Sequence, residues 1–309
     1  MRKDICKKTF FLFAFYLTSN AIIAQTLPAT KEYPGITLER TETRILRSEI
    51  VDQDYELLIS LPRSYSTSTT KYPVIFLLDP FRAFSMVKGF TDALTAPFQI
   101  IPEVILIGIG YGGDGMQGRL NWALGRVRDY TPVQNSDTEE WYENAIEASG
   151  LSDINVISGG APLFLDFIRT ELFPFVESNY RIDTSERMLS GYSFGGLFGI
   201  YALFHDPALF DKYFLGSPSI GFQDGISLEY EVRYAKTHED LEAEVFMSAG
   251  EKEDSYIEYL NKMVEQISEH HYKSLTLDTH IFENESHVTC YPAAMSRGLI
   301  ELFGKENDE

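Results

Sequence analysis

The sequence predicts an α/β fold with a largely parallel sheet, and three observations indicate it. Two runs, YPVIFLLD (72–79) and EVILIGIG (103–110), are continuously apolar, as expected of strands that are covered on both faces. Segments with helical periodicity alternate with the strands along the chain. A strand also turns into a helix at Ser193, where glycines crowd the turn. The chain has 309 residues, of which 44% are hydrophobic, which suffices for the core of one large domain.

The expected elements follow from the N-terminus onward. Two alternating segments, 40–50 and 54–62, are typical of strands, and a helix over 83–94 separates the two apolar runs. From Gly112 to Gly160 the chain is rich in Gly, Asn, Asp and Thr, which predicts a long functional loop or lid with a short helix at 141–149. The remaining expected elements are helix 162–180, strand 186–193, strand 244–250, helix 255–271, strand 276–282 and helix 290–303.

The stretch LSGYSFGGLFGIYAL, residues 189–203, predicts a nucleophilic serine. Ser193 stands between Gly191 and Gly195, where an apolar strand becomes a helix. A serine on so sharp a turn has a strained backbone, and glycine two residues to either side removes collisions with the neighbouring strand and helix. The turn exposes the hydroxyl at the carboxyl edge of the sheet, and the first N–H groups of the helix can bind an oxyanion.

A serine hydroxyl needs a general base, and in this architecture an acid and then a histidine follow the serine along the chain. His287 lies in a polar loop after the last strand and ahead of the last helix, which is the position expected of the base. The acid is expected in GEKEDSY, directly after strand 244–250. Spacing favours Glu253. Glu251 and Asp254 remain alternatives for the acid, and a serine–histidine dyad is a further one. Each of the three acids could instead serve only to stabilise the N-terminus of the following helix.

Two backbone amides are predicted to form an oxyanion hole. Phe194 directly follows the nucleophile and supplies one N–H group. The other is expected from the loop after 72–79, where Pro80 has no N–H and Phe81 does. Both residues would act through the backbone, so their side chains would shape the pocket.

Four further residues are candidates for substrate binding. Arg82 lies beside the oxyanion loop and would meet an anionic group of the substrate; an ordinary surface arginine is the alternative. Aromatic side chains that would line an acyl or catechol pocket are Tyr111, Trp122 and Tyr192. Arg128 and Asp129 are instead predicted to form an internal ion pair that pins the long loop.

The N-terminus predicts export. Basic residues, an apolar stretch and the small Ala24 follow one another as in a signal peptide, so 1–24 is expected to be removed and 25–309 to form the catalytic domain. A membrane anchor is the alternative, but Ser19 and Asn20 interrupt the apolar stretch. The expected location is periplasmic or extracellular.

Charge and cysteine content exclude several kinds of partner and site. The net charge of −20 disfavours nucleic acid and anionic membrane surfaces as partners. After cleavage only Cys290 remains, which rules out an internal disulfide and a cysteine metal site, and a buried thiol is its expected role. The predicted chemistry needs neither a cofactor nor a metal.

The chain resembles the putative-esterase branch of the α/β-hydrolases, which includes siderophore esterases, feruloyl and acetylxylan esterases and S-formylglutathione hydrolases. The resemblance runs from about Arg44 to Phe303. It depends on YPVIFLLDPFRAF, RDYTP, GGAPLFLDFIRTELFPFVESNYRID, GYSFGGLFGIYALFHDPALFDKYFLGSPS, GEKED and the late ESH. It implies an α/β-hydrolase fold and the roles given above for the serine, histidine, acid and oxyanion residues. One departure is Pro80, where the family often has glycine.

The prediction is therefore an exported serine esterase that forms an acyl-enzyme. Siderophore esters and acyl esters on polysaccharide are the candidate substrates, so the expected partner is a small-molecule or glycan-linked ester. A non-catalytic ligand-binding protein on the same fold and an acyltransferase are the alternative functions. The sequence indicates no oligomeric state.

Overall fold

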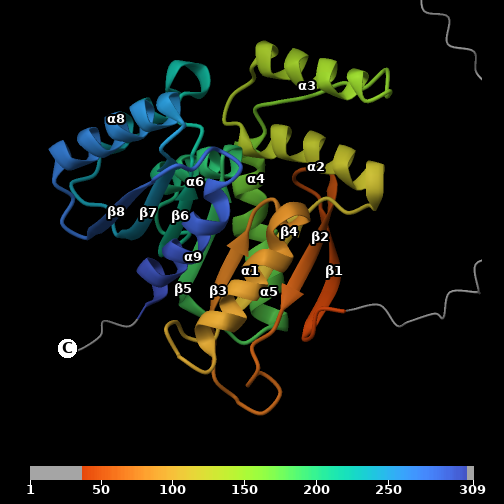
Figure 1. Cartoon of the computed structure of the whole chain (residues 1–309), viewed down its shortest axis with the longest axis vertical. Helices are drawn as coiled ribbons and strands as arrows, with labels where there is room; N and C mark the ends of the chain where they lie inside the picture. Colours follow the sequence, from red (N-terminus) through yellow and green to blue (C-terminus); the bar gives the residue numbers. More distant parts are fainter. Residues whose placement is uncertain (1–36, 305–309) are drawn as a thin grey trace, which may run out of the picture. The chain divides into compact units, whose positions relative to one another are not determined.

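The computed structural model describes residues 37–304, so the predicted signal peptide lies outside the described residues. Within this range eight strands form one sheet in the order β1-β2-β4-β3-β5-β6-β7-β8 (Figure 1). β1 pairs antiparallel with β2 and β2 with β4, and all other neighbours are parallel. The strands are β1 (Thr41–Ser48), β2 (Gln53–Ser60), β3 (Tyr72–Leu77), β4 (Ile105–Gly110), β5 (Ile182–Tyr192), β6 (Lys212–Gly216), β7 (Ala243–Gly250) and β8 (Leu275–Phe282). The predicted α/β class with a mostly parallel sheet is confirmed.

Helices cover both faces of this sheet. They are α1 (Pro80–Thr95), α2 (Gly115–Tyr130), α3 (Ser136–Ala148), α4 (Ala161–Phe167), α5 (Phe173–Asn179), α6 (Phe194–His205), α7 (Ile226–Ala235), α8 (Asp254–His270) and α9 (Cys290–Phe303). A π-helical turn, η1 (Ile168–Leu172), joins α4 to α5, and a short 3₁₀ turn, η2 (Phe222–Asp224), precedes α7. α1 and α9 pack on one face, and α4 to α8 enclose the larger core on the other (Figure 1).

The parallel strands position the site because their carboxyl ends meet at one edge of the sheet. β3, β5, β6, β7 and β8 run in the same direction. The side chains of β6 are all buried, and those of β3 and β7 nearly so, which anchors the strands from which the loops leave. The loops after these strands carry Asp79, Ser193, Ser217, Glu253 and His287. Residues far apart in sequence are therefore brought to a single edge.

The region 112–160 differs from the predicted long loop because it holds helix α2, whereas α3 lies where the short helix at 141–149 was predicted. Two glycines inside α2 mark close contacts instead of breaks. A Cβ on Gly118 would lie 2.3 Å from the carbonyl oxygen of Gly113, and a Cβ on Gly125 would lie 2.3 Å from the ring of Tyr111. The loop prediction was wrong because glycine is also used where a helix packs tightly. The short strand β6 and helix α7 were not predicted.

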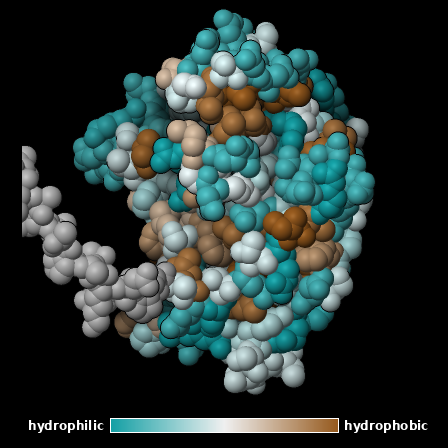
Figure 2. All heavy atoms as spheres, turned by 90° about the vertical axis from the view of Figure 1, so that its right-hand side faces the viewer, coloured by the Kyte–Doolittle hydropathy of each residue, from teal (hydrophilic) through white to brown (hydrophobic). Residues whose placement is uncertain are grey.

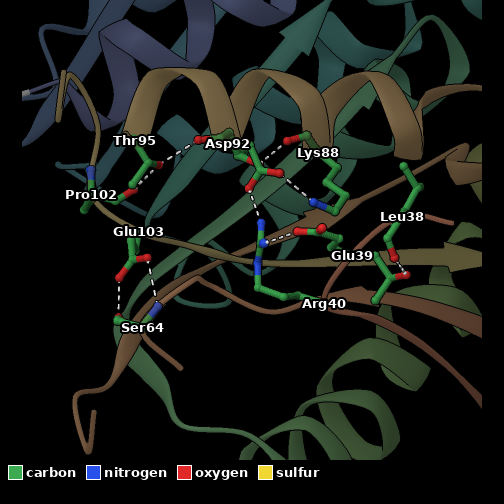
Figure 3. A network of polar contacts seen from close by, with 11 residues as sticks. Leu38, Glu39, Arg40, Ser64, Lys88, Asp92, Thr95, Pro102 and Glu103 are labelled. Atoms are coloured by element: carbon green, nitrogen blue, oxygen red, sulfur yellow. Dashed lines mark hydrogen bonds and ion pairs between the residues drawn. The ribbon is translucent and has the colours of Figure 1, made fainter. Parts of the chain in front are cut away.

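At the opposite edge of the sheet a polar network attaches the start of the described chain to the last turns of α1 (Figure 3). Arg40 donates to Asp92 at 2.8 Å, and Lys88, one turn earlier on α1, donates to the same carboxylate at 2.6 Å. Next to it, the carboxylate of Glu103 accepts a hydrogen bond from the backbone of Ser64. These contacts hold the end of the sheet where the parallel strands begin, away from the loops of the site.

The surface on the side of β1 carries both hydrophobic and hydrophilic residues. Figure 2 shows hydrophobic residues there in several separate groups among predominantly hydrophilic ones. Exposed apolar residues in the described chain include Ile45 on β1 and Ile157 before α4. In the described part of the chain, every helix is too short or too polar to cross a bilayer.

Candidate active site

Ser193 occupies a strained turn between β5 and α6. Its backbone has φ 60° and ψ −117°, a region that a residue other than glycine rarely adopts. Two backbone hydrogen bonds hold the turn: Ser193 N–H donates to Gly216 O at 2.9 Å, and Ser219 N–H donates to Ser193 O at 3.1 Å. The residue is partly exposed, and its hydroxyl oxygen lies 3.5 Å from that of Ser219. This is the strand–turn–helix geometry that the sequence predicts.

At two of the three glycines around the serine, a Cβ would collide with neighbouring atoms. A Cβ on Gly191 would lie 2.2 Å from the carbonyl oxygen of Gly195, and a Cβ on Gly196 would lie 2.8 Å from Pro218. At Gly195 the nearest atom, on Leu78, would be 3.5 Å away, which is an ordinary contact. The expectation that Gly195 relieves a collision was wrong, because the crowded position is the next one along the helix.

His287 and Glu253 contact each other across the loops that follow β8 and β7. The Nδ1 atom of His287 lies 2.5 Å from Oε1 of Glu253. The carboxylate is buried, whereas the imidazole is about one-third exposed, with its side chain at 36%. Of the other acid candidates, Glu251 instead accepts a hydrogen bond from the backbone of Asn284, and Asp254 begins α8. The structure thus brings the favoured acid to the predicted histidine.

The second oxygen of Glu253 is also fully engaged. Oε2 accepts hydrogen bonds from Gly250 N–H at 2.6 Å and from the Ser217 hydroxyl at 2.8 Å. Burial raises the pKa of the Glu253 carboxyl, but the hydrogen bonds from His287, Gly250 and Ser217 together bring it below its ordinary value. The carboxylate is therefore ionised at neutral pH and fixed in orientation.

Tyr192 links the serine turn to the histidine loop. Its hydroxyl donates to the carbonyl oxygen of His287 at 2.8 Å and lies 2.8 Å from the hydroxyl of Ser217. The ring is buried and packs on Tyr291 with the centroids 4.3 Å apart. The structure thus places this residue, predicted to contact substrate, beneath the histidine loop. Burial also raises the pKa of the neighbouring Cys290 thiol to about 11, which keeps the thiol protonated.

The two predicted oxyanion donors lie at the first turns of two helices. Phe81 is the second residue of α1 and Phe194 the first residue of α6, so the N–H groups of both have no intrahelical partner. The ring of Phe194 packs against Tyr142 of α3 and Phe222 of η2, with centroids 6.3 and 5.9 Å away. The Phe81 side chain is 46% exposed.

A buried ionic cluster lies directly before Phe81, and the sequence reasoning missed it. The carboxylate of Asp79 accepts hydrogen bonds from Trp122 Nε1 at 2.6 Å and from Arg126 Nε and Nη2 at 3.0 and 3.3 Å. The backbone N–H of Asp79 donates to the hydroxyl of Tyr130 at 3.2 Å. All three partners belong to α2. An aspartate that ends an apolar strand is the signal that was available in the sequence.

Two cavities lie beside these residues. One of about 320 Å³ is lined by Phe81, Tyr111 and Trp122, together with the glycine-rich turn after β4. The other, of about 220 Å³, is lined by Ser219 and by aromatic side chains of η2 and α8, among them Tyr256. The guanidinium of Arg82 lies over the Trp122 ring at 4.9 Å. The structure therefore brings together all the predicted substrate-binding residues except Tyr192.

Two other predictions concern ions. Arg128 Nε lies 2.6 Å from Asp129 Oδ1, and the carboxylate of Asp129 is completely buried, so the predicted internal ion pair is present. Within residues 37–304 no group of three or more His, Cys, Asp or Glu side chains is arranged to hold a metal ion.

Comparisons with known proteins identify the family of the chain. The family model described as Putative esterase matches residues 48–255. The ferri-bacillibactin esterase BesA of Bacillus subtilis (strain 168) is 29% identical over 286 residues, which cover 86% of this chain and 90% of that protein.

Solved structures agree as well. The BES protein from Bacillus cereus superposes with a TM-score of 0.74 at 26% identity, over 90% of this chain and 100% of that one. The siderophore hydrolase EstB from Aspergillus nidulans gives 0.70 at 21% identity, over 90% and 99%. The chain therefore belongs to the putative-esterase family, has the α/β-hydrolase fold and is a carboxylic ester hydrolase.

Proposed function

We propose that the chain hydrolyses carboxylic esters through an acyl-enzyme, with Ser193 as nucleophile, His287 as general base and Glu253 as the orienting acid. The observation that carries the proposal is the 2.5 Å contact between His287 Nδ1 and Glu253 Oε1, at the sheet edge that exposes the strained serine. When Nδ1–H donates to this carboxylate, the lone pair of the imidazole is on Nε2. This nitrogen can then accept the proton of the serine hydroxyl.

The reaction divides into two steps. The Ser193 oxygen attacks the ester carbonyl while His287 takes its proton, and the Glu253 carboxylate stabilises the imidazolium. The N–H groups of Phe81 and Phe194 bind the oxyanion, and such a donor is typically worth about 3 kcal/mol in the transition state. Collapse of the intermediate expels the alcohol, which takes the proton from the histidine. Water then attacks the acyl-enzyme by the same route and releases the acid.

We further propose that the substrates are small-molecule siderophore esters rather than acyl groups on polysaccharide. The Bacillus subtilis relative is named for ferri-bacillibactin, and the Aspergillus nidulans structure for siderophore hydrolysis. Cavities of about 320 and 220 Å³ next to the oxyanion residue Phe81 and next to Ser219 offer room for the groups on a compact ester. A panel of siderophore lactones, feruloyl esters and acetylated xylan, with purified protein, tests the choice: highest kcat/KM for the lactones is expected.

The nucleophile is tested with an activated aryl ester and a fluorophosphonate probe. The parent should release a burst of aryl alcohol and become labelled, and Ser193→Ala should do neither. Ser190→Ala is the matched control: this serine lies on β5, the strand that leads into Ser193, and its buried hydroxyl has no hydrogen-bond partner within the described chain. It should retain both signals. An active Ser193→Ala variant contradicts the proposal.

The same experiment separates the alternative functions. A folded parent that binds ester without reacting with the probe would indicate a ligand-binding protein. Addition of a competing alcohol distinguishes hydrolysis from acyl transfer, because a transferase would yield the new ester as its main product. We expect the free acid to predominate.

We also propose that the protein is exported and cleaved after Ala24. The order of basic, apolar and small residues at the N-terminus supports this. Expression of the full chain followed by cell fractionation and N-terminal sequencing tests it. The expected N-terminus of the exported protein is Gln25, and retention of the uncleaved chain in the cytoplasm or the membrane would contradict export.

A further inference from the structure

The loop that carries Phe81 begins in an unfavourable backbone conformation. Asp79 has φ 53° and ψ 42°, in the left-handed region that residues with a Cβ avoid. Pro80 follows it directly, and a proline disfavours helical conformations of the residue before it. The loop therefore keeps this shape only where other contacts hold it.

Two attachments hold the loop, one on each side. On the sheet side, Leu78 N–H donates to Ser190 O at 2.9 Å, which fixes the loop to the strand that leads into Ser193. On the other side, α2 holds Asp79 through its carboxylate and its backbone N–H, as described above. The position of the Phe81 amide relative to the serine thus depends on both β5 and α2.

Arg126 contacts both Asp79 and the ring of Phe194. Its Nε is 3.0 Å from the Asp79 carboxylate, two residues before Phe81, and its guanidinium lies 5.2 Å from the ring centroid of Phe194. The side chains of Arg126 and Asp79 are each only 9% exposed. An ion pair so deeply buried is lost only at a large cost in free energy, so it fixes the geometry firmly.

We propose that Trp122 and Arg126 are positioning residues that act through Asp79 to hold the Phe81 amide in place for the oxyanion. The inference rests on the proposed function, since it assumes that this amide binds the oxyanion of an ester intermediate. The hydrogen bonds from α2 keep Asp79 left-handed, and that conformation directs the following N–H groups of α1. Helix α2 is thereby part of the catalytic framework, although none of its side chains needs to touch the reacting atoms.

The test uses Trp122→Phe and Asp79→Asn. The first keeps an aromatic ring but removes the donor, and the second keeps an acceptor but removes the charge that Arg126 balances. Displacement of a catalytic donor by about 1 Å costs up to about 100-fold in rate. We expect kcat to fall about 10- to 100-fold in both variants. In Asp79→Asn, whose side chain does not line the cavity, KM should stay within about twofold of the parent, because the lost interaction exists only in the transition state.

A trifluoromethyl ketone inhibitor supplies the readout that a merely structural role would not move. It forms a tetrahedral oxyanion adduct with a reactive serine. Across the variants its Ki should rise in proportion to the fall in kcat/KM, whereas in Asp79→Asn the Ki of the carboxylic acid product should stay constant. Arg126→Lys, which keeps a cation near Asp79, should retain more activity than Arg126→Met.

Tyr55→Phe is the matched control. The Tyr55 hydroxyl donates to Asp129 at 2.7 Å, and this buried carboxylate also pairs with an arginine of α2, Arg128. The control removes the same kind of bond away from the oxyanion loop, so kcat and the ketone Ki should match the parent. If Trp122→Phe and Asp79→Asn behave like this control, the inference is wrong. That result is distinct from failure of the proposed function, which would appear as an active Ser193→Ala.

Discussion

Asp79 and Glu253 are two buried carboxylates at the same edge of the sheet, and the protein stabilises them in different ways. Asp79, after β3, is 7% exposed and has Arg126 as a permanent counter-charge. Glu253, after β7, is 6% exposed and accepts two neutral hydrogen bonds. Within residues 37–304 its one ion-pair partner is His287, which is charged only when protonated.

This difference determines what each carboxylate can do during a reaction. Arg126 balances the charge of Asp79 at all times. Asp79 can therefore hold a loop, but it does not stabilise charge that develops elsewhere during the reaction. Glu253 has no permanent cation, so an imidazolium formed at His287 is stabilised more than the neutral ring. An interaction that is stronger in the transition state than in the ground state accelerates the reaction. In the proposed mechanism, the first loop therefore provides geometry and the second provides electrostatic stabilisation.

Glu253→Gln should give the largest effect on activity. The amide keeps the shape but removes the charge that orients and stabilises the imidazolium, and in serine hydrolases this change typically costs about 10⁴-fold in kcat. We expect a fall of about 10³- to 10⁴-fold in kcat for aryl ester hydrolysis, far beyond that of Asp79→Asn. Equal losses in the two variants would remove the distinction drawn here.

Arg126→Met should give the largest effect on stability. It leaves the Asp79 carboxylate buried without its cation, and removal of one partner from a buried pair typically costs about 3–5 kcal/mol. Urea unfolding should show this loss, whereas Glu253→Gln should cost less because no permanent cation loses its partner. If Arg126→Met is as stable as the parent, the charge of Asp79 is compensated by other means.

The stability of the parent should depend on pH through Glu253. The pKa of this carboxyl is lower in the folded chain than its ordinary value of 4.5, despite the opposing effect of burial. A lowered folded pKa contributes stability that is complete above the unfolded pKa and is lost as pH falls through the folded pKa. The gap in unfolding free energy between the parent and Glu253→Gln should therefore narrow below about pH 4.5. A gap that stays constant down to pH 3 would contradict the lowered pKa.

Asp92→Asn should give the smallest effect. This carboxylate, near the C-terminal end of α1, is about one-third exposed and pairs with Lys88 and Arg40 (Figure 3). Exposed pairs contribute at most about 1 kcal/mol, and the asparagine oxygen can still accept a hydrogen bond. We expect a loss of no more than about 1 kcal/mol in urea unfolding and an unchanged kcat. A tenfold loss of activity would mean that both ends of α1 control the oxyanion loop.

Local patterns in the sequence were enough to place Ser193 at a strand-to-helix turn and to expect His287 in the loop after the last strand. Apolar runs mark buried strands, and the order of strand, turn and helix is a property of neighbouring residues. The same local reasoning mistook α2 for a loop, because Gly118 and Gly125 are glycines for the sake of contacts with other residues.

What the sequence by itself determined is therefore the α/β class, the kinked serine turn and the small set of acids from which Glu253 came. Only the tertiary structure decided which acid meets His287, that Tyr192 lies under the histidine loop, and that α2 holds Asp79. The physical reason is range. Propensity and periodicity act over a few residues, whereas these contacts join residues between 34 and 95 positions apart, and only the pairing order of the strands brings them together.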